Sequence, residues 1–407
     1  MLKTIAAIVF IFFCTAIAWM ILGWTIAART DSSDAGNKTR MFTNRGGPQT
    51  QTPPTATYIL QTVVATGDNS DKPQKREVKS TSVSLPVESS DIRVALHLDQ
   101  RKKGLLWYSG YSDKFDGTFS FTNPADSPRS VTFAVRLPAE HAVYDDLCMT
   151  LDGTPLAATS QGGIASATSI VNSHSTVKLN VSYRSQGLDT WTYSFGDTAS
   201  AVNNFSLRMS TDFSGFDFDE STLAPTSERI NGTGHELDWQ YSNLVSGFPI
   251  GIRMPEKIQP GPMAGRIIFF APVSLFFFFF ALFILTTVRG IPLHPMNYFF
   301  LACTFFSFHL LLAYLVDHIS IHLAFPICSL VSIFLLVSYL RLVVSPRFAM
   351  FQAGLIQLVY LVLFSYAFFF EGFTGLTITI GVILSLFIVM QMTARVRWSE
   401  KFARPAS

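Results

Sequence analysis

Six ionisable residues in the C-terminal third of the chain carry side chains suited to metal binding or proton transfer. They are His294, His309, Asp317, His318, His322 and Glu371. Imidazole and carboxylate groups are common metal ligands and proton carriers. His309 lies inside a long apolar run, where an ionisable group is costly enough to be a candidate functional residue. The set is therefore the first candidate for a functional polar cluster.

A structural role competes with this interpretation, and we favour it. Asp317, His318 and Glu371 fall in short polar loops where water can hydrate them, and His309 can hydrogen-bond a neighbouring carbonyl. The chain has no His-Glu-x-x-His motif, no Cys/His zinc spacing, no phosphate-binding Gly-rich loop and no Gly-x-Ser-x-Gly motif. The sequence therefore predicts no catalytic residue, no metal site, no cofactor and no enzymatic activity.

Long apolar runs must position these residues. Five runs of about 18–23 residues follow residue 265, and each can cross a hydrocarbon core of about 30 Å as a helix. We expect these spans at 266–288, 297–316, 321–340, 349–370 and 376–393. A sixth run, from Thr4 to about Ala27, is longer than the apolar core of a signal peptide, so we expect an uncleaved anchor. The spans predict a polytopic α-helical bundle with six transmembrane helices.

The segment between the first and second helices has a different pattern. Apolar and polar residues alternate around Ile92, Val131 and Val177, as they do in strands with one buried face. Many short strands separated by turns predict one large all-β domain, an antiparallel sandwich or barrel-like fold. The predicted organisation is an anchor at 1–28, a polar stalk at 29–57, the β domain at 58–262, a five-helix module at 263–393 and a basic tail at 394–407.

Charge differs sharply between the two parts. The segment 28–262 has 21 Lys and Arg against 25 Asp and Glu, whereas the rest of the chain has 9 against 3. The short loops on one side of the spans carry the Lys and Arg, and the two loops on the other side carry none. The positive-inside rule therefore places both termini in the cytoplasm and the β domain outside it. The four basic residues that follow the first span disagree with this orientation. No dense basic stripe suggests nucleic-acid binding.

Short motifs in the C-terminal module resemble those of a known family. Leu293-His294-Pro295-Met296-Asn297-Tyr298 opens one span, and the run from Phe308 to Ile319 closes it. Phe364-Ser365-Tyr366 and Thr393-Ala394-Arg395-Val396-Arg397-Trp398 follow in order. Together, over residues 290–398, they resemble the CreD inner-membrane protein family. The resemblance implies a Gram-negative inner-membrane protein with a periplasmic domain and a role in cell-envelope integrity.

Three functional hypotheses follow. The first is a non-enzymatic envelope protein whose periplasmic β domain binds a periplasmic or membrane protein partner or an envelope component. The second is a small transporter or channel built on the helical bundle, for which Ser307 and Ser332 are scattered polar candidates. The third is an intramembrane metalloenzyme that uses His309, Asp317 and His318. A membrane-embedded stress sensor that signals through a partner is a further alternative. The lipid bilayer is a partner in every case, and the oligomeric state stays open.

Overall fold

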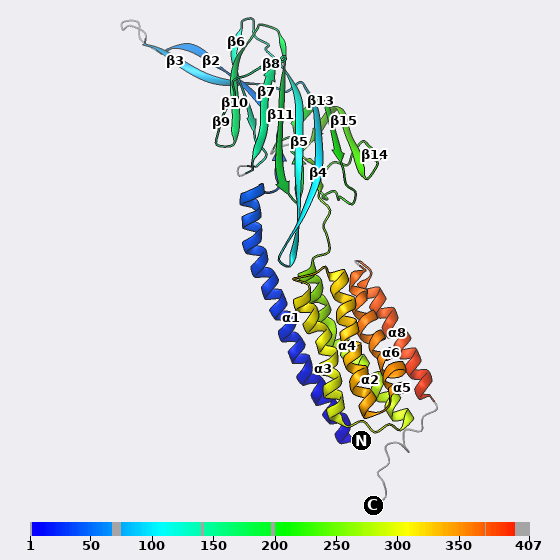
Figure 1. Ribbon diagram of the computed structural model, residues 1–407. Coiled ribbons are helices and arrows are strands. Elements are labelled where there is room, and N and C mark those ends of the chain that lie inside the picture. Colours follow the sequence, from blue (N-terminus) through cyan, green and yellow to red (C-terminus); the bar gives the residue numbers. More distant parts are fainter. Residues whose placement is uncertain (1, 67–74, 140–141, 197–199, 371, 395–407) are drawn as a thin grey trace, which may run out of the picture. The chain divides into compact units, whose positions relative to one another are not determined.

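The computed structural model describes residues 2–66, 75–139, 142–196, 200–370 and 372–394. It divides into two compact units, which are coloured along the chain in Figure 1. The helical unit comprises Met1–Ala35, Gly104–Leu106 and Ile258–Ser407, and the β unit comprises Gly36–Lys103 and Trp107–Lys257. Each unit has its own hydrophobic core.

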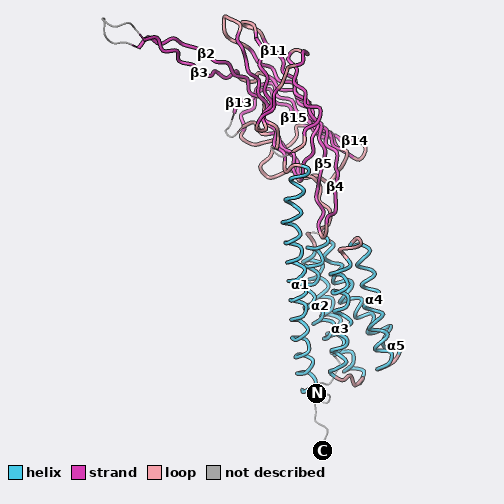
Figure 2. Tube along the Cα trace, turned by 60° about the vertical axis from the view of Figure 1, so that its left-hand side comes forward, coloured by secondary structure: helices cyan, strands magenta, loops and turns pink. Residues whose placement is uncertain are grey.

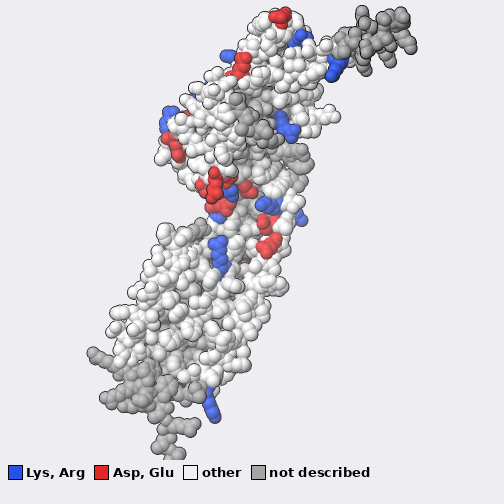
Figure 3. Space-filling view, turned by 180° about the vertical axis from the view of Figure 1, so that it is seen from behind, with Lys and Arg blue, Asp and Glu red and all other residues white. Residues whose placement is uncertain are grey.

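Within its described residues, the helical unit contains six helices that are long and apolar enough to cross a membrane, which confirms the predicted bundle. Their bounds are α1 (Leu2–Arg45), α2 (Pro260–Arg289), α3 (Pro295–Leu315), α4 (Ile321–Val343), a fifth span over Pro346–Phe369 and α8 (Thr374–Thr393). On the face drawn in Figure 3, Lys, Arg, Asp and Glu are nearly absent from the middle of this unit. A helix satisfies its own backbone hydrogen bonds, so such a surface is suited to lipid.

Helix α1 extends well past the predicted anchor. The sequence predicts a polar stalk from residue 29 without regular structure, but α1 continues to Arg45. Thr30 donates a hydrogen bond to the Ile26 carbonyl (2.9 Å), and no proline occurs before Pro48 to break the helix. Gly46 then takes a left-handed conformation (φ 80°) and its N–H bonds to the Phe42 carbonyl, which ends the helix. The expectation of an unordered segment was therefore wrong for 29–45.

The fifth span is irregular along its length. Short α-helical pieces, α5 (Pro346–Phe348), α6 (Gly354–Gln357) and α7 (Phe364–Tyr366), alternate with π-helical turns at Ala349–Ala353 and Leu358–Leu363. A π-turn widens the helix and releases backbone carbonyls from the regular ladder. The Ser274 hydroxyl of α2 donates to one of them, the Tyr360 carbonyl.

The β unit consists of three sheets that are mainly antiparallel, as predicted. The strands of the eight-stranded sheet lie in the order β14 (Ser227–Asn231), β15 (Gly234–Ser246), β13 (Ser200–Thr211), β4 (Ser89–Lys103), β5 (Leu106–Thr122), β11 (Thr176–Leu188), β7 (Tyr144–Leu151) and β8 (Thr154–Pro155). The five-stranded sheet contains β3 (Lys75–Leu85), β2 (Thr55–Thr66), β6 (Arg129–Arg136), β10 (Ile164–Val171) and β9 (Thr159–Gln161). The small sheet contains β1 (Gln49–Gln51), β12 (Thr190–Tyr193) and β16 (Ile250–Arg253). Two pairings, β1 with β12 and β4 with β13, are parallel.

The larger sheets pack face to face through alternate side chains. Phe119 and Phe121 of β5 and Phe133 of β6 are buried, and the Phe121 and Phe133 rings lie 5.7 Å apart. The alternation seen around Ile92, Val131 and Val177 has its apolar side in this core. Among the described residues, β2 pairs with β6 and with β3, and β2 and β3 form a hairpin that projects from the sheet in Figure 2.

Candidate functional site

His309 lies at the centre of the helical unit and is fully buried. Its Nδ1 lies 3.1 Å from the Phe305 carbonyl oxygen. Because a carbonyl can only accept, Nδ1 carries the proton and Nε2 presents a lone pair. Neither Nε2 nor the Trp19 indole nitrogen has a partner in the described part of the chain, and the two rings lie 5.8 Å apart. The structure thus places His309 among aromatic rings, with one unused acceptor.

The other described residues of the predicted set lie at the two ends of the unit. His294 caps the N-terminus of α3, where its Nδ1 accepts a hydrogen bond from the Met296 N–H (3.2 Å). Asp317 follows the opposite end of α3, a helix of 21 residues that is about 30 Å long. His318 is exposed beside it, and His322 packs its ring 5.7 Å from that of Phe369 on the fifth span.

Asp317 forms an ion pair with Arg29 of α1. The guanidinium group also stacks over the Tyr314 ring at 5.1 Å. Arg29 is one of the four basic residues whose position after the first span disagrees with the predicted orientation. The Asp317 carboxylate neutralises its charge. Glu371 lies outside the described residues. Among those described, no three His, Cys, Asp or Glu side chains come together as a metal site.

Sequence reasoning named Ser332 as a polar candidate but missed the chain of polar groups across the helical core to which it belongs. Gln357 of the fifth span donates to the Ser332 hydroxyl of α4 (2.7 Å), and Ser332 donates to the Thr304 carbonyl of α3 (2.6 Å). Gln357 is fully buried, and its Oε1 has no donor among the described residues. A glutamine within the apolar run 349–370 was the available signal.

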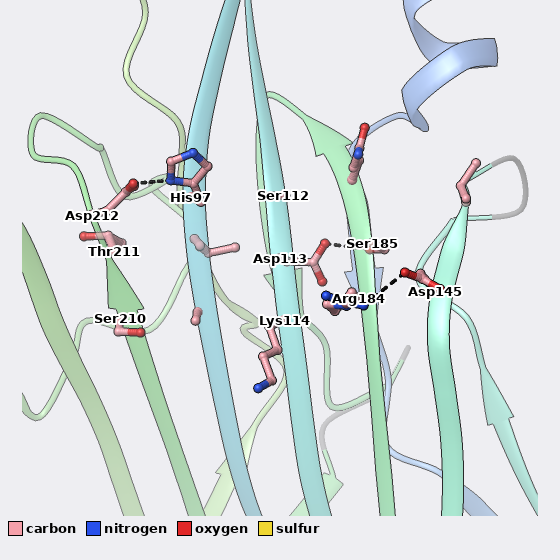
Figure 4. Close-up of a pocket in the computed structure, with 14 residues that line it drawn as sticks. His97, Ser112, Asp113, Lys114, Asp145, Arg184, Ser185, Ser210, Thr211 and Asp212 are labelled. Atoms are coloured by element: carbon pink, nitrogen blue, oxygen red, sulfur yellow. Dashed lines mark hydrogen bonds and ion pairs between the residues drawn. The ribbon is translucent and has the colours of Figure 1, made fainter.

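The β unit carries a polar groove of about 610 Å³ on its eight-stranded sheet (Figure 4). Strands β4, β5, β7, β11 and β13 supply its lining. One wall holds a close pair between His97 and Asp212, whose Oδ1 also accepts from the Leu98 N–H (3.2 Å). The other wall holds Arg184, paired with Asp145 at 3.1 Å and with Asp146.

The strand register places a cation in the floor of this groove. Arg184 of β11 stands opposite Lys114 of β5 on one side and Asp145 of β7 on the other. Like charges on directly opposed residues repel. The two carboxylates balance Arg184, whereas the Lys114 ammonium has no partner in the described part of the chain. Among the described residues, the floor therefore presents one unpaired ammonium group, that of Lys114, although the formal charges of these four side chains sum to zero.

Asp113, which directly precedes Lys114 on β5, belongs to a buried hydrogen-bond network beside the groove. The Ser185 hydroxyl donates to Asp113 Oδ1 (2.6 Å), and the Gln49 amide donates to Ser185 Oγ (2.7 Å). Neither Asp113 Oδ2 nor Gln49 Oε1 has a donor among the described residues. Burial raises the pKa of Asp113 to about 6. The same burial raises the pKa of Tyr111, Tyr144 and Tyr183, so these neighbours stay neutral.

The comparisons with known proteins point to one family. The family described as "Inner membrane protein CreD" matches residues 1–399. No curated protein matches the chain in sequence.

Two solved structures each align with less than half of this chain. A putative nutrient binding protein from Legionella pneumophila has 10% identity and a TM-score of 0.33, covering 47% of this chain and 70% of that one. An M1 zinc metallopeptidase from Deinococcus radiodurans has 9% identity and a TM-score of 0.29, covering 42% of each chain. Likenesses at this level carry no functional argument.

Proposed function

This chain belongs to the CreD family of inner membrane proteins, and from that premise we propose that it supports the cell envelope by binding an anionic envelope component in the groove of its β unit. The protein catalyses no reaction in this proposal. The helical unit anchors the binding site in the membrane. Family membership supports a multi-pass inner membrane protein linked to envelope function.

The unpaired ammonium group of Lys114 carries the proposal. It lies beside Arg184 in a groove large enough for a small ligand or a segment of polymer. A carboxylate or phosphate group placed there would pair with the Lys114 ammonium and gain a charge-assisted hydrogen bond. Ser112 and Ser210 line the same groove and offer hydroxyl groups to a polar ligand.

The test compares Lys114→Gln with Lys178→Gln. Lys178 lies six residues before Arg184 on β11, is exposed, and does not line the groove. Both variants lose one positive charge from the same sheet. In a deletion strain challenged with detergent, we expect the wild type and Lys178→Gln to prevent leakage and Lys114→Gln to fail.

Binding gives a second readout of the same pair of variants. The full chain in lipid nanodiscs would be sedimented with isolated peptidoglycan sacculi, which are rich in carboxylates, at low and high salt. The wild type and Lys178→Gln should co-sediment in a salt-sensitive manner, and Lys114→Gln should stay in solution. Equal behaviour of the two variants in both assays would refute the groove as the binding site.

The proposal requires the β unit to lie outside the cytoplasm, with both termini inside. The absence of Lys and Arg from the loops at 317–320 and 370–373 supports this orientation, as does the pairing of Arg29 with Asp317. Cys148 is exposed on β7 and is a natural reporter. A membrane-impermeant thiol reagent should label it when the outer membrane alone is permeabilised, and Cys148→Ser should abolish that labelling. Labelling only after lysis would reverse the orientation.

Transport through the helical unit is the second candidate function. The polar chain from Thr304 through Ser332 to Gln357, next to π-helical turns, is the observation that favours it. Against it, the three residues are uncharged and largely bonded to one another. A proton flux in proteoliposomes that Gln357→Leu abolishes would support transport, and wild-type flux equal to that of empty vesicles would exclude proton transport.

A further inference from the structure

A second cavity lies within the helical unit, between α2, the fifth span and α8. Its volume is about 560 Å³, and apart from Gln352, Tyr360, Thr377 and Ser385 its lining is apolar. Figure 1 shows α8 beside the fifth span. The cavity is separate from the groove of the β unit, and the inference drawn from it does not depend on the proposed function.

Helix α8 packs loosely against its neighbours across this cavity. Ser385 is its one buried residue, and the structure describes α8 along its full length. Each hydroxyl group of α8 donates to a carbonyl of the preceding turn rather than to another helix, as Ser385 does to Gly381 (2.7 Å). A Cβ atom added at Gly381, which lines the cavity, would meet no atom within 4 Å. The chain itself therefore leaves this space unfilled.

An apolar space of this size is unfavourable when empty, because its lining loses dispersion contacts. Water relieves that cost only near the few polar side chains, since a water molecule needs two or more polar partners and most of the lining is apolar. For helices that cross a bilayer, the apolar material at hand is the hydrocarbon chain of a lipid.

One end of the cavity carries two arginines. Arg289 lies one helical turn beyond Leu285, and Arg347 lies one turn before Phe351, and both of these apolar residues line the cavity. Both arginines are exposed, and neither guanidinium group has a partner in the described part of the chain. Arginine binds phosphate through paired hydrogen bonds. Basic pockets between membrane helices are suited to anionic lipid head groups.

We propose that this cavity holds an acyl chain of an anionic glycerophospholipid, whose phosphate lies at Arg289 and Arg347. The aliphatic lining recognises the chain, and the two arginines select the charge of the head group. The bound lipid completes the packing of α8 against α2 and the fifth span.

Native mass spectrometry of the purified, delipidated full chain tests the proposal. The protein is incubated with equal amounts of dioleoyl-phosphatidylglycerol and dioleoyl-phosphatidylcholine, which share acyl chains and differ in net charge. We expect one tightly bound phosphatidylglycerol per chain. Removing both arginines, in Arg289→Gln/Arg347→Gln, should lower the preference for phosphatidylglycerol about 30-fold. The matched control Lys3→Gln/Arg341→Gln removes two charges from α1 and α4, which do not line the cavity, and should keep the preference.

The acyl-chain half of the proposal has its own pair of variants. Gly381→Leu should fill the cavity and abolish retention of both lipids. Gly375→Leu places the same side chain on α8, also in open space but outside the cavity, and should retain phosphatidylglycerol. Equal retention of the two lipids by the wild type would overturn the proposal. Equal lipid preference in Arg289→Gln/Arg347→Gln and Lys3→Gln/Arg341→Gln would also overturn it. So would equal lipid retention in Gly381→Leu and Gly375→Leu.

Discussion

Replacing Asp113 with asparagine should stabilise the β unit at neutral pH. The carboxyl group has an ordinary pKa of 3.8, and burial raises its pKa to about 6 in the folded protein. The folded state therefore holds this proton more tightly than the unfolded chain does. The stability that the protonated group contributes is complete below about pH 4 and is lost as the pH rises through 6.

The size of the effect follows from the two pKa values. Their difference is about 2 units, each worth about 1.36 kcal/mol, so ionisation of Asp113 costs the folded state about 3 kcal/mol above pH 6. Asparagine keeps an oxygen that accepts from Ser185 and places an N–H donor where Asp113 Oδ2 has none. The variant avoids the cost of ionisation without leaving a cavity.

Amide hydrogen exchange measures the prediction on the full chain in nanodiscs. Comparison at equal pH removes the intrinsic pH dependence of exchange. Core amides of β5 and β11 should exchange about 150-fold more slowly in Asp113→Asn than in the wild type at pH 7.5, and at nearly equal rates at pH 4. The control Asp91→Asn, at an exposed position on β4, should match the wild type throughout. A ratio for Asp113→Asn that is near one at pH 7.5, or that does not change with pH, would refute the reasoning.

Three further experiments test the packing within each unit. Arg29→Gln and Asp317→Asn should show a coupling of about 1 kcal/mol in a double-mutant cycle of thermal unfolding, because the pair is partly shielded from water, and strict additivity would contradict it. Gly234→Ala should destabilise the β unit by about 3 kcal/mol or more in the same assay, since the new Cβ would lie 1.7 Å from the Thr211 carbonyl oxygen, and a wild-type melting temperature would show this contact to be wrong. Ser332→Ala should cost about 1–3 kcal/mol because it leaves the buried Gln357 amide unpaired, whereas Gln357→Leu should cost less, and the opposite order would contradict the bonding assigned here.

The sequence alone determined the class of each unit. Unbroken apolar runs of about 20 residues are stable in a bilayer only as helices, so the six spans were predictable from local composition. Alternation around Ile92, Val131 and Val177 likewise determined which side chains of β4, β6 and β11 face the core. Short ordered motifs near the C-terminus also indicated the family that matches nearly the whole chain.

Only the tertiary structure decided which polar residues meet. The sequence identified His309 as an ionisable group within a span and Asp317 as one beside it, but Arg29, which pairs with Asp317, lies 288 residues away in sequence. The groove depends on strand register, since β5, β7 and β11 bring Lys114, Asp145 and Arg184 into one row. Local patterns specify which face of an element is apolar. Registers and partners depend on the summed packing of distant segments, and the charge environments of Lys114 and Asp113 follow from that packing.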